Sequence, residues 1–316
     1  MKIWSLLFWS CASLAAQSLP CHGNSYVLST FQGSLQQLLL EFSPDGVNFG
    51  CSATVSYAPQ VRDPSIMFYS GKWWVAHTNA GAVGCTQDNG FSVTSSSDLQ
   101  TWANPICVIP AVSGSALAWA PEWFIDTDGS VHIVVAVSTE GCSFGSSNMQ
   151  IYEMHPTAAD FSTWSNPVLL TVSGMTDIID PFMVKVGSTY YLWFKQSCST
   201  GDIGYASSSS LTGAYTLVQS GNWAGWGPAE GPALYFLGGS SWRLYWDICS
   251  GGACSGVLGQ LYHTESTDNW VTWSAPVALN TPGQAKQGTV ISYAPGLTGG
   301  SVLRGQGTLR GNVVMH

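Results

Sequence analysis

The sequence predicts an all-β fold, a five-bladed β-propeller built as a single domain, and three observations support this prediction. Strand-like segments recur at a nearly constant interval, each carries an acidic residue close to a proline near its start, and no helical apolar period of useful length follows the N-terminal segment. Repeats of about 40–50 residues are typical of propellers, in which each blade is a four-stranded sheet. A β-sandwich is the alternative fold.

The repeated unit combines an apolar strand, a turn that contains glycine, and a second strand. Alternation and the content of β-branched and aromatic residues favour strands, and DTDGS at 126–130 favours a hairpin turn over a calcium loop. The segments SSSDLQTWANP, AADFSTWSNP and STDNWVTWSAP are expected to be outer strands that end in a tryptophan and a turn. Four copies of the unit begin at Arg62 (RDPSIMFYSGKWWVAHT), Ala120 (APEWFIDTDGSVHIVVAVS), Ile179 (IDPFMVKVGSTYYLWFK) and Glu230 (EGPALYFLGGSSWRLYWD).

Acidic residues mark the spacing of the repeats. Five units of about 55 residues fit the five blades of a propeller. Residues 24–50 and the C-terminal GGSVLRG are expected to help close the ring, because an open ring leaves bare strand edges. The markers are Asp63, Glu122, Asp180 and Glu230, which are 59, 58 and 50 residues apart, and a further 57 residues lead to Gln287 in KQGTVISYAP.

The first residues are typical of a secretory signal peptide. They include one lysine, an apolar run and small residues at Ala15 and Ala16. We therefore expect residues 1–16 to be removed and residues 17–316 to form a secreted, extracellular propeller domain. A buried N-terminal helix is the alternative.

The cysteines and the charge balance agree with that location. Of nine cysteines, Cys11 leaves with the signal peptide, and the other eight allow up to four disulfides, with Cys249 and Cys254 close enough to clip one loop. The formal net charge of −9 argues against a nucleic-acid partner, whereas a neutral polysaccharide or oligosaccharide is compatible with it. After the N-terminal segment, no run of residues reaches the about 18 apolar residues that a membrane span needs. We expect the protein to be a monomer.

The acidic markers are expected to converge. In a propeller, the innermost strand of each blade starts at the central channel, so Asp63, Asp180 and Glu230 would meet in one pocket. A proline is tolerated as the first residue of a strand, which would let the preceding aspartate face the channel. Carboxylates crowded in a low-dielectric funnel have pKa values that are pushed apart. Glycoside hydrolysis needs this arrangement, with one carboxylate charged and one protonated.

Four short motifs form a specific combination in their order and spacing: RDPS (62–65), WAPEW (119–123), IDP (179–181) and EGP (230–232). On these motifs, the chain resembles glycoside hydrolase family 43 over about residues 55–295. The resemblance implies five-bladed enzymes that cut arabinofuranosyl and xylosyl linkages with inversion of the anomeric carbon. It also implies that Asp63 is the general base, that Asp180 orients the acid and tunes its pKa, and that Glu230 is the general acid.

One position departs from the family pattern. The fifth blade of the family usually supplies a histidine near the axis, often beside calcium or water, whereas this chain has Gln287. Galactanases of the wider family carry an amide there but typically lack the first-blade base. No cofactor and no metal ligand is therefore predicted, and a structural calcium ion has no support in the sequence.

Four further residues are candidates for substrate contact. Glu122 is expected either to bind a sugar hydroxyl or to accept a backbone hydrogen bond at a strand start. Trp119 and Trp226 precede acidic markers and are candidates for stacking on sugar, whereas most other tryptophans are expected to pack between blades. Arg243 lies inside an expected strand and needs a partner, for which a substrate hydroxyl is one candidate.

The sequence predicts an enzyme of polysaccharide degradation and leaves the sugar, the linkage and endo or exo action open. The alternatives are a galactan-active or retaining propeller glycosidase, and a carbohydrate-binding propeller without catalysis.

Overall fold

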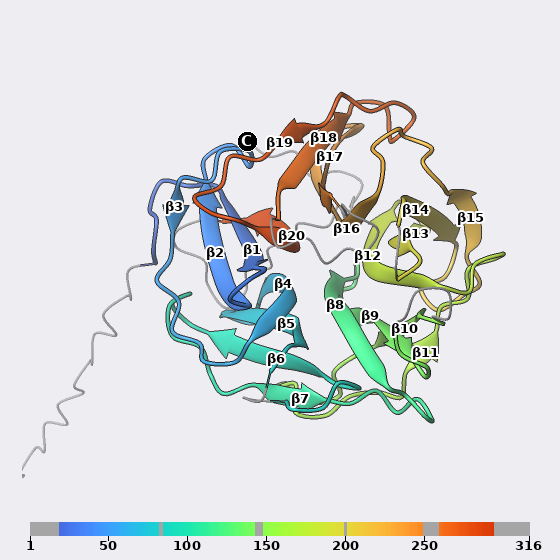
Figure 1. Cartoon of the computed structure of the whole chain (residues 1–316), viewed down its shortest axis with the longest axis horizontal. Coiled ribbons are helices and arrows are strands. Elements are labelled where there is room, and N and C mark those ends of the chain that lie inside the picture. The colour runs from blue at the N-terminus through green and yellow to red at the C-terminus, as the bar shows by residue number, and fades with distance from the viewer. Residues whose placement is uncertain (1–18, 82–84, 143–147, 199–200, 249–258, 294–316) are drawn as a thin grey trace, which may run out of the picture.

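The computed structural model describes residues 19–81, 85–142, 148–198, 201–248 and 259–293, and within them the chain forms five four-stranded antiparallel sheets around a central axis (Figure 1). The predicted five-bladed propeller is confirmed. The predicted signal peptide, the GGSVLRG segment and the Cys249 and Cys254 pair lie outside the described residues. Among the described residues, no helix is long and apolar enough to cross a membrane.

The blades are numbered in chain order, and the strands of each follow from the axis outwards. Blade 1 contains β4 (Val61–Tyr69), β5 (Lys72–Asn79), β6 (Phe91–Ser96) and β7 (Ile106–Val108). Blade 2 contains β8 (Leu117–Ile125), β9 (Val131–Ser138), β10 (Gln150–Met154) and β11 (Val168–Leu169). Blade 3 contains β12 (Ile178–Val186), β13 (Thr189–Gln196), β14 (Ile203–Ser208) and β15 (Thr216–Gln219). Blade 4 contains β16 (Ala229–Gly238), β17 (Ser241–Ile248), β18 (Leu261–Ser266) and β19 (Val277–Ala278). Blade 5 contains β20 (Lys286–Ser292), β1 (Tyr26–Gln32), β2 (Gln37–Ser43) and β3 (Cys51–Ser52).

Tight turns join the two inner strands of each repeat. Ser70 and Gly71, between β4 and β5, both have positive φ, as the mirror-image hairpin turns require. The DTDGS segment at 126–130 likewise joins β8 to β9, so its interpretation as a hairpin turn is confirmed.

The segments that were expected to be outer strands are turns instead. SSSDLQTWANP begins with the last two residues of β6 and then turns, and its Asp98 Oδ1 accepts hydrogen bonds from the backbone N–H groups of Gln100 and Thr101. An aspartate that binds the backbone two and three residues ahead favours a turn over a strand. The tryptophan of this segment, Trp102, is buried because the turn folds back onto the core.

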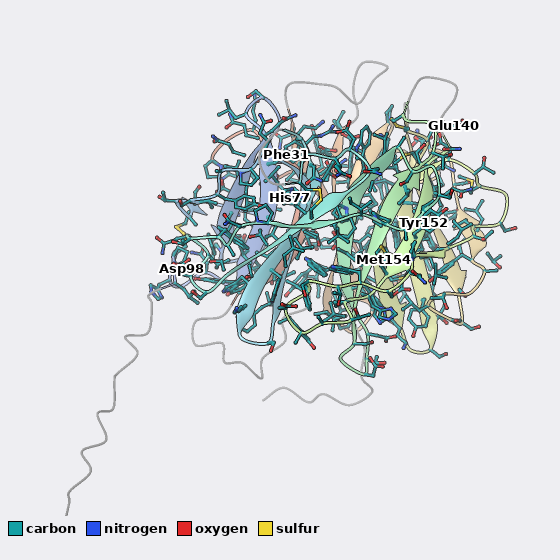
Figure 2. The ribbon with its side chains drawn as sticks, turned by 90° about the horizontal axis from the view of Figure 1, so that it is seen from below. Phe31, His77, Asp98, Glu140, Tyr152 and Met154 are labelled. Carbon is teal, nitrogen blue, oxygen red and sulfur yellow. A yellow bond between two sulfur atoms is a disulfide. The ribbon has the colours of Figure 1, made fainter. Side chains whose placement is uncertain are left out.

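Clusters of buried hydrophobic side chains join neighbouring blades, and Figure 2 shows the side chains on the ribbon. Trp74 packs between blades 1 and 2, and Trp193 and Trp246 belong to the core that joins blades 3, 4 and 5. The packing role that was expected for most tryptophans is confirmed at these positions. Large aromatic side chains suit this role because each buries much apolar area with few rotatable bonds.

Blade 5 joins the two ends of the described chain. Its inner strand β20 pairs with β1, so residues 26–52 supply the three outer strands of the last blade. The expectation that residues 24–50 help close the ring is confirmed. Gly288 lies where β20 approaches β1 most closely, since a Cβ atom at this position would collide with the carbonyl oxygen of Ser29.

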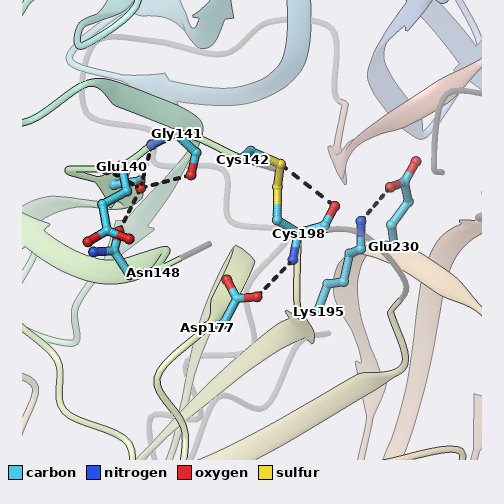
Figure 3. Close-up of a disulfide and its surroundings, with 9 residues drawn as sticks. Glu140, Gly141, Cys142, Asn148, Asp177, Lys195, Cys198 and Glu230 are labelled. Carbon is cyan, nitrogen blue, oxygen red and sulfur yellow. Dashed lines mark hydrogen bonds and ion pairs between the residues drawn. A yellow bond between two sulfur atoms is a disulfide. The ribbon is translucent and has the colours of Figure 1, made fainter. Parts of the chain in front are cut away.

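Three disulfides stabilise loops and edges of the described chain. Cys21–Cys51 ties the entrance of blade 5 to β3, Cys85–Cys107 lies within blade 1, and Cys142–Cys198 links blade 2 to blade 3 (Figure 3). Six of the eight cysteines that follow the predicted signal peptide are thus paired.

Substitution of Gly288 by alanine is expected to destabilise the ring at its closure. The new methyl group would meet the Ser29 carbonyl, and φ of +140° is a conformation that alanine rarely adopts. We expect Gly288→Ala to lower the free energy of unfolding by about 2–4 kcal/mol, measured by denaturant titration. Gly50→Ala in the same blade is the control, because a Cβ atom there would have no other atom within 4 Å. Equal effects of the two substitutions would contradict the explanation.

Candidate active site

The five inner strands share one irregularity close to the axis. In each, the pairing with the neighbouring strand is interrupted, and the residue at the interruption has a positive φ. Such β-bulges remove a residue from the ladder and redirect its side chain. The bulge residues in blade order are Asp63 (φ 48°), Ala120 (49°), Asp180 (53°), Gly231 (62°) and Gln287 (36°), and the first four precede prolines.

The bulges correct two sequence-based expectations. Pro64 is not the first residue of its strand, because β4 begins at Val61 and Asp63 lies at the bulge. The acids of four blades are not in equivalent positions either, because Glu122 stands two residues after its bulge residue and Glu230 stands one residue before. The position of the bulge in the backbone defines the repeat. A carboxylate can reach the axis from the bulge residue itself or from a residue shortly before or after it.

The bulges surround a cavity of about 30 Å³, lined by Asp63, Glu122, Asp180 and Gln287 together with prolines and glycines of the same segments. A space of this size holds about one or two water molecules. The structure therefore brings together four of the predicted site residues, from blades 1, 2, 3 and 5.

Asp63 is held by a neighbouring strand. Thr78 of β5 donates a hydrogen bond to Asp63 Oδ2 at 2.8 Å, and the same hydroxyl accepts one from the backbone N–H of Ala120 at 2.7 Å. Burial raises the pKa of Asp63 above its ordinary value, and the charge of Glu230 adds to the shift, while Arg62 and the bond from Thr78 lower it. The acid is thus fixed in orientation, and the charge of Glu230 contributes to its raised pKa.

Asp180 connects three blades. Its Oδ2 accepts hydrogen bonds from the Gln287 side-chain amide at 3.0 Å and from the backbone N–H of Gly231 at 3.2 Å. Gly231 permits this approach, since a Cβ atom there would lie 2.6 Å from the Gln287 side chain. Burial and the charges of Glu230 and Asp63 raise the pKa of Asp180, although Lys195 opposes the shift. Gln287 thus orients Asp180 in this site.

Glu230 forms a double ion pair beside the cavity. Lys195 Nζ lies 3.0 Å from its Oε2, and Lys286 Nζ lies 3.1 Å from its Oε1 (Figure 3 shows the first). The Glu230 side chain is 5% exposed, so these charges are buried together. A buried carboxylate is costly without such partners, and loss of one partner leaves a charge uncompensated.

Glu122 reaches across the axis. Thr289 of blade 5 donates a hydrogen bond to its Oε2 at 2.8 Å. Burial raises the pKa of Glu122 to about 8, although the hydrogen bonds with Thr289 and Ser65 lower it. Glu122 is therefore a protonated carboxylic acid at neutral pH, able to donate a hydrogen bond inside the cavity.

Sequence reasoning missed Lys195, Asp247 and Lys286. Asp247 of β17 stands opposite Glu230 and is fully buried, and its Oδ2 accepts a hydrogen bond from the backbone N–H of Gln287. Burial raises the pKa of Asp247 well above its ordinary value, and the charge of Glu230 adds to this. The sequence contains a signal for two of these residues, because Lys195 and Asp247 are the single charged residues that end the aromatic segments YYLWFK and LYWD. A buried strand tolerates such a charge only when another group pairs with it.

Three predicted contact residues do not line the cavity. Trp119 lies next to the Ala120 bulge, with the Arg62 guanidinium 5.4 Å from its ring centroid. Trp226 packs among other tryptophans, with Trp246 stacked at 6.0 Å between ring centroids.

Arg243 is the third, and its donors are engaged far from the bulges. Its Nε and Nη2 bind Glu265 Oε1 at 2.9 and 2.6 Å, and its Nη1 donates to the Asp45 carbonyl of blade 5. It lies four residues before Asp247 on β17, about 13 Å along the strand.

The fold and the converging acids define a five-bladed propeller of the glycoside hydrolase class. Residues 65–295, more than two thirds of the chain, match the glycosyl hydrolase family 43-related domain, described as a probable glycosyl hydrolase domain. The chain belongs to this family of glycoside hydrolases, as the resemblance in its motifs indicated. No curated protein matches the sequence.

Solved structures share the fold at low sequence identity. A thermostable family-43 glycoside hydrolase is 17% identical with a TM-score of 0.57, covering 84% of this chain and 94% of its own. An α-L-arabinanase of Cellvibrio cellulosa in complex with arabinohexaose is 18% identical with a TM-score of 0.55, covering 83% and 93%. A xylan β-1,4-xylosidase of Bacillus halodurans C-125 is 16% identical with a TM-score of 0.56, covering 78% and 51%. These likenesses concern the fold alone.

Replacement of Glu122 by glutamine is expected to change the pH dependence of stability. Because the folded state keeps the Glu122 proton up to a pKa of about 8 whereas the ordinary value is 4.5, the parent loses stability as the pH rises between these values. Glu122→Gln lacks this loss, so its stability relative to the parent should rise by on the order of a few kcal/mol between pH 5 and pH 8, measured by urea unfolding. A difference that does not vary with pH would show that Glu122 is not a protonated acid in the folded protein.

Proposed function

We propose that the protein is a secreted glycoside hydrolase that cleaves arabinofuranosyl or xylosyl linkages of plant-type polysaccharide with inversion. The observation that carries the proposal is that Asp63 and Asp180 line the axial cavity, and that the charge of Glu230, which does not line it, raises the pKa of both. Acids that share a field ionise at different pH values, which acid–base catalysis at a glycosidic bond requires.

In the proposed mechanism, Asp63 is the general base. Its carboxylate faces the cavity, and Thr78 holds one oxygen, which leaves the other free to take a proton from an attacking water. The cavity is large enough for such a water. Asp180 is the positioning residue, since Gln287 and Gly231 fix it beside both other acids.

Glu230 is the proposed general acid. The ion pairs with its two lysines favour the charged carboxylate, which has no proton to donate. In the ion-paired state Glu230 is charged, so it must take up a proton before it can protonate a leaving group. Asp180 and Asp247 are nearby carboxyl groups whose pKa values are raised by burial and by the Glu230 charge, so each is a candidate source of that proton. Transfer from either to Glu230 would prepare the acid without a proton from bulk water.

The proposed substrate class follows the family. The solved relatives with the same fold include an arabinanase and a xylosidase, which supports pentose-containing polysaccharide as the first substrate to test. Within the proposed site, Glu122 as a protonated acid would donate to a sugar hydroxyl, and Trp119 beside the bulge would contact the ring from outside the cavity. The locations of Trp226 and Arg243 give no support for substrate contact.

Secretion and domain organisation are part of the proposal. Residues 1–16 would be the signal peptide and residues 17–316 the catalytic propeller. Three disulfides support an oxidising compartment. The net charge of −9 supports a monomeric enzyme of neutral polysaccharide rather than a nucleic-acid partner.

A galactan substrate is the second candidate, because Gln287 replaces the usual histidine and binds Asp180 directly. Arabinan, arabinoxylan, xylo-oligosaccharides and galactans should therefore be compared, with the products identified. Release of galactose alone would exclude the pentose assignment.

The anomeric configuration of the first product, followed by proton NMR, should be inverted, and retention would exclude the proposed mechanism.

Loss of either proposed proton-transfer group should abolish most of the activity. We expect Glu230→Gln to lower kcat about 10²–10⁴-fold with oligosaccharide binding retained, because the amide cannot protonate the leaving group. Asp63→Asn should have a similar effect, since it cannot accept the proton of the attacking water.

Asp160→Asn is the control for these variants, because Asp160 is exposed in a turn after β10. Near-parent turnover of either site variant on the best substrate would refute the assigned roles. A parent that binds oligosaccharide but releases no sugar from any substrate would identify a binding protein instead.

A further inference from the structure

A second cluster of titratable side chains lies in blade 2, outside the cavity. His132 is near the start of β9, Glu153 is in β10, and His155 directly follows β10. The strands pair Met154 with Ile133, so His155 would stand opposite His132 when this register is continued by one residue. Because Glu153 and His155 are two residues apart, all three side chains project from one face of the sheet.

The three side chains converge on a single oxygen atom. Glu153 Oε1 lies 2.7 Å from His132 Nδ1 and 3.3 Å from His155 Nδ1, and the three ligand atoms are all within 4.8 Å of one another. Figure 2 labels Tyr152 and Met154, the chain neighbours of Glu153. The Glu153 side chain is 3% exposed, so a carboxylate is buried between two imidazoles.

The hydrogen bonds around His132 indicate which of its nitrogens is free to bind a cation. Ser130 Oγ donates to Asp128 Oδ1 at 2.6 Å and lies 2.8 Å from His132 Nε2. Since the serine proton is used on Asp128, Ser130 accepts the His132 Nε2 proton. In a neutral imidazole, the Nδ1 lone pair would then face the Glu153 oxygen at 2.7 Å. Two lone pairs at this distance repel, so in this arrangement a second imidazole proton or a metal ion lies between them. If the serine proton is on the side of His132 Nε2 instead, the neutral imidazole donates its Nδ1 proton to Glu153, and a metal ion would displace that proton.

The surroundings fit a metal ion. Two imidazoles and one carboxylate form a known donor set for Zn²⁺, and the serine behind His132 orients the ring as partners of metal-binding histidines do. Ligand atoms of a tetrahedral zinc ion lie about 3.4 Å apart, which the His155–Glu153 pair matches at 3.3 Å. The His132–Glu153 separation would lengthen by about half an ångström on binding.

The cluster is also accessible. It borders a cavity of about 630 Å³ that is lined by Ser130, His132 and His155 and by residues of the β4–β5 turn. The His155 side chain is 49% exposed and the His132 side chain 14%. The ion could therefore enter from solvent, and water could complete its coordination.

We propose that His132, Glu153 and His155 bind one divalent transition-metal ion of the zinc type, through the two Nδ1 atoms and Glu153 Oε1, with water in the remaining position. Among the described residues, this is the one group of three or more His, Cys, Asp or Glu side chains with ligand atoms this close. Ser130 lies in the turn that joins the end of β8 to the start of β9, whereas the bulge of β8 lies nearer the other end of that strand. The proposed ion is therefore separate from the glycosidase site.

The experiment uses the full chain without a histidine tag, treated with a chelator and titrated with Zn²⁺ by calorimetry at pH 7.5. We expect one zinc ion per chain. His155→Ala should weaken binding at least tenfold, and because His155 is half-exposed the variant should fold as the parent does, which circular dichroism would verify. Ser130→Ala should weaken binding about tenfold, because the orientation of His132 is lost.

His22→Ala is the matched control, because His22 is an exposed histidine at the entrance of blade 5. It should bind zinc as the parent does. Substitution of Co²⁺ should give the strong visible absorption of a tetrahedral site in the parent and in His22→Ala but not in His155→Ala. If the parent binds zinc no tighter than His155→Ala does, or does not bind it at all, a proton rather than a metal ion lies between His132 and Glu153. Either result would overturn the proposal.

Discussion

The candidate site depends on a backbone conformation that most residues avoid. Asp63, Ala120 and Asp180 have positive φ directly before a proline, where the preferred conformation is extended. A non-glycine residue in the left-handed region costs on the order of 1–3 kcal/mol. The surrounding sheets must offset this cost at several points of the ring, and the result is a set of strand segments that all turn towards the axis. The bulges redirect side chains near them towards one cavity, whose lining includes Asp63, Glu122 and Asp180.

A second constraint is the balance of buried charge that the bulges create. Glu230 is compensated by Lys195 and Lys286, whereas Asp180 and Glu122 are accommodated by raised pKa values. The site thus combines ion pairing and protonation, the two ways in which a protein can bury a carboxylate. Hydrogen bonds from Gln287 and Thr289 orient Asp180 and Glu122 from another blade. The Thr78 hydroxyl donates to Asp63 within blade 1 and accepts from the backbone N–H of Ala120 in blade 2, so the position of each acid depends on more than one blade.

Much of the architecture could be predicted, because propeller repeats leave a period in the sequence. The hairpin turns, the tryptophan packing and the participation of the N-terminal strands in ring closure follow from local patterns. The predicted equivalence of the acidic markers was wrong. The repeats were compared by their acidic residues, whereas the feature that recurs in the backbone of the first four blades is a bulge residue followed by a proline. Lys195 and Asp247 were missed because the group that each contacts lies in another blade, and contacts across blades leave no spacing rule in the sequence. The turns after the third strands were taken for strands because their aromatic residues fold back into the core.

The pairing of β20 with β1 makes the candidate site dependent on closure of the ring. Lys286, Gln287 and Thr289 come from a strand near the end of the chain, yet they hold acids from blades 2, 3 and 4. While the chain is still emerging, β1 has an unpaired edge and Glu230 lacks one of its two lysines. A polypeptide in which β20 has not yet paired with β1 would consequently be prone to associate through that edge, and its buried acids would lack the partners that compensate and orient them.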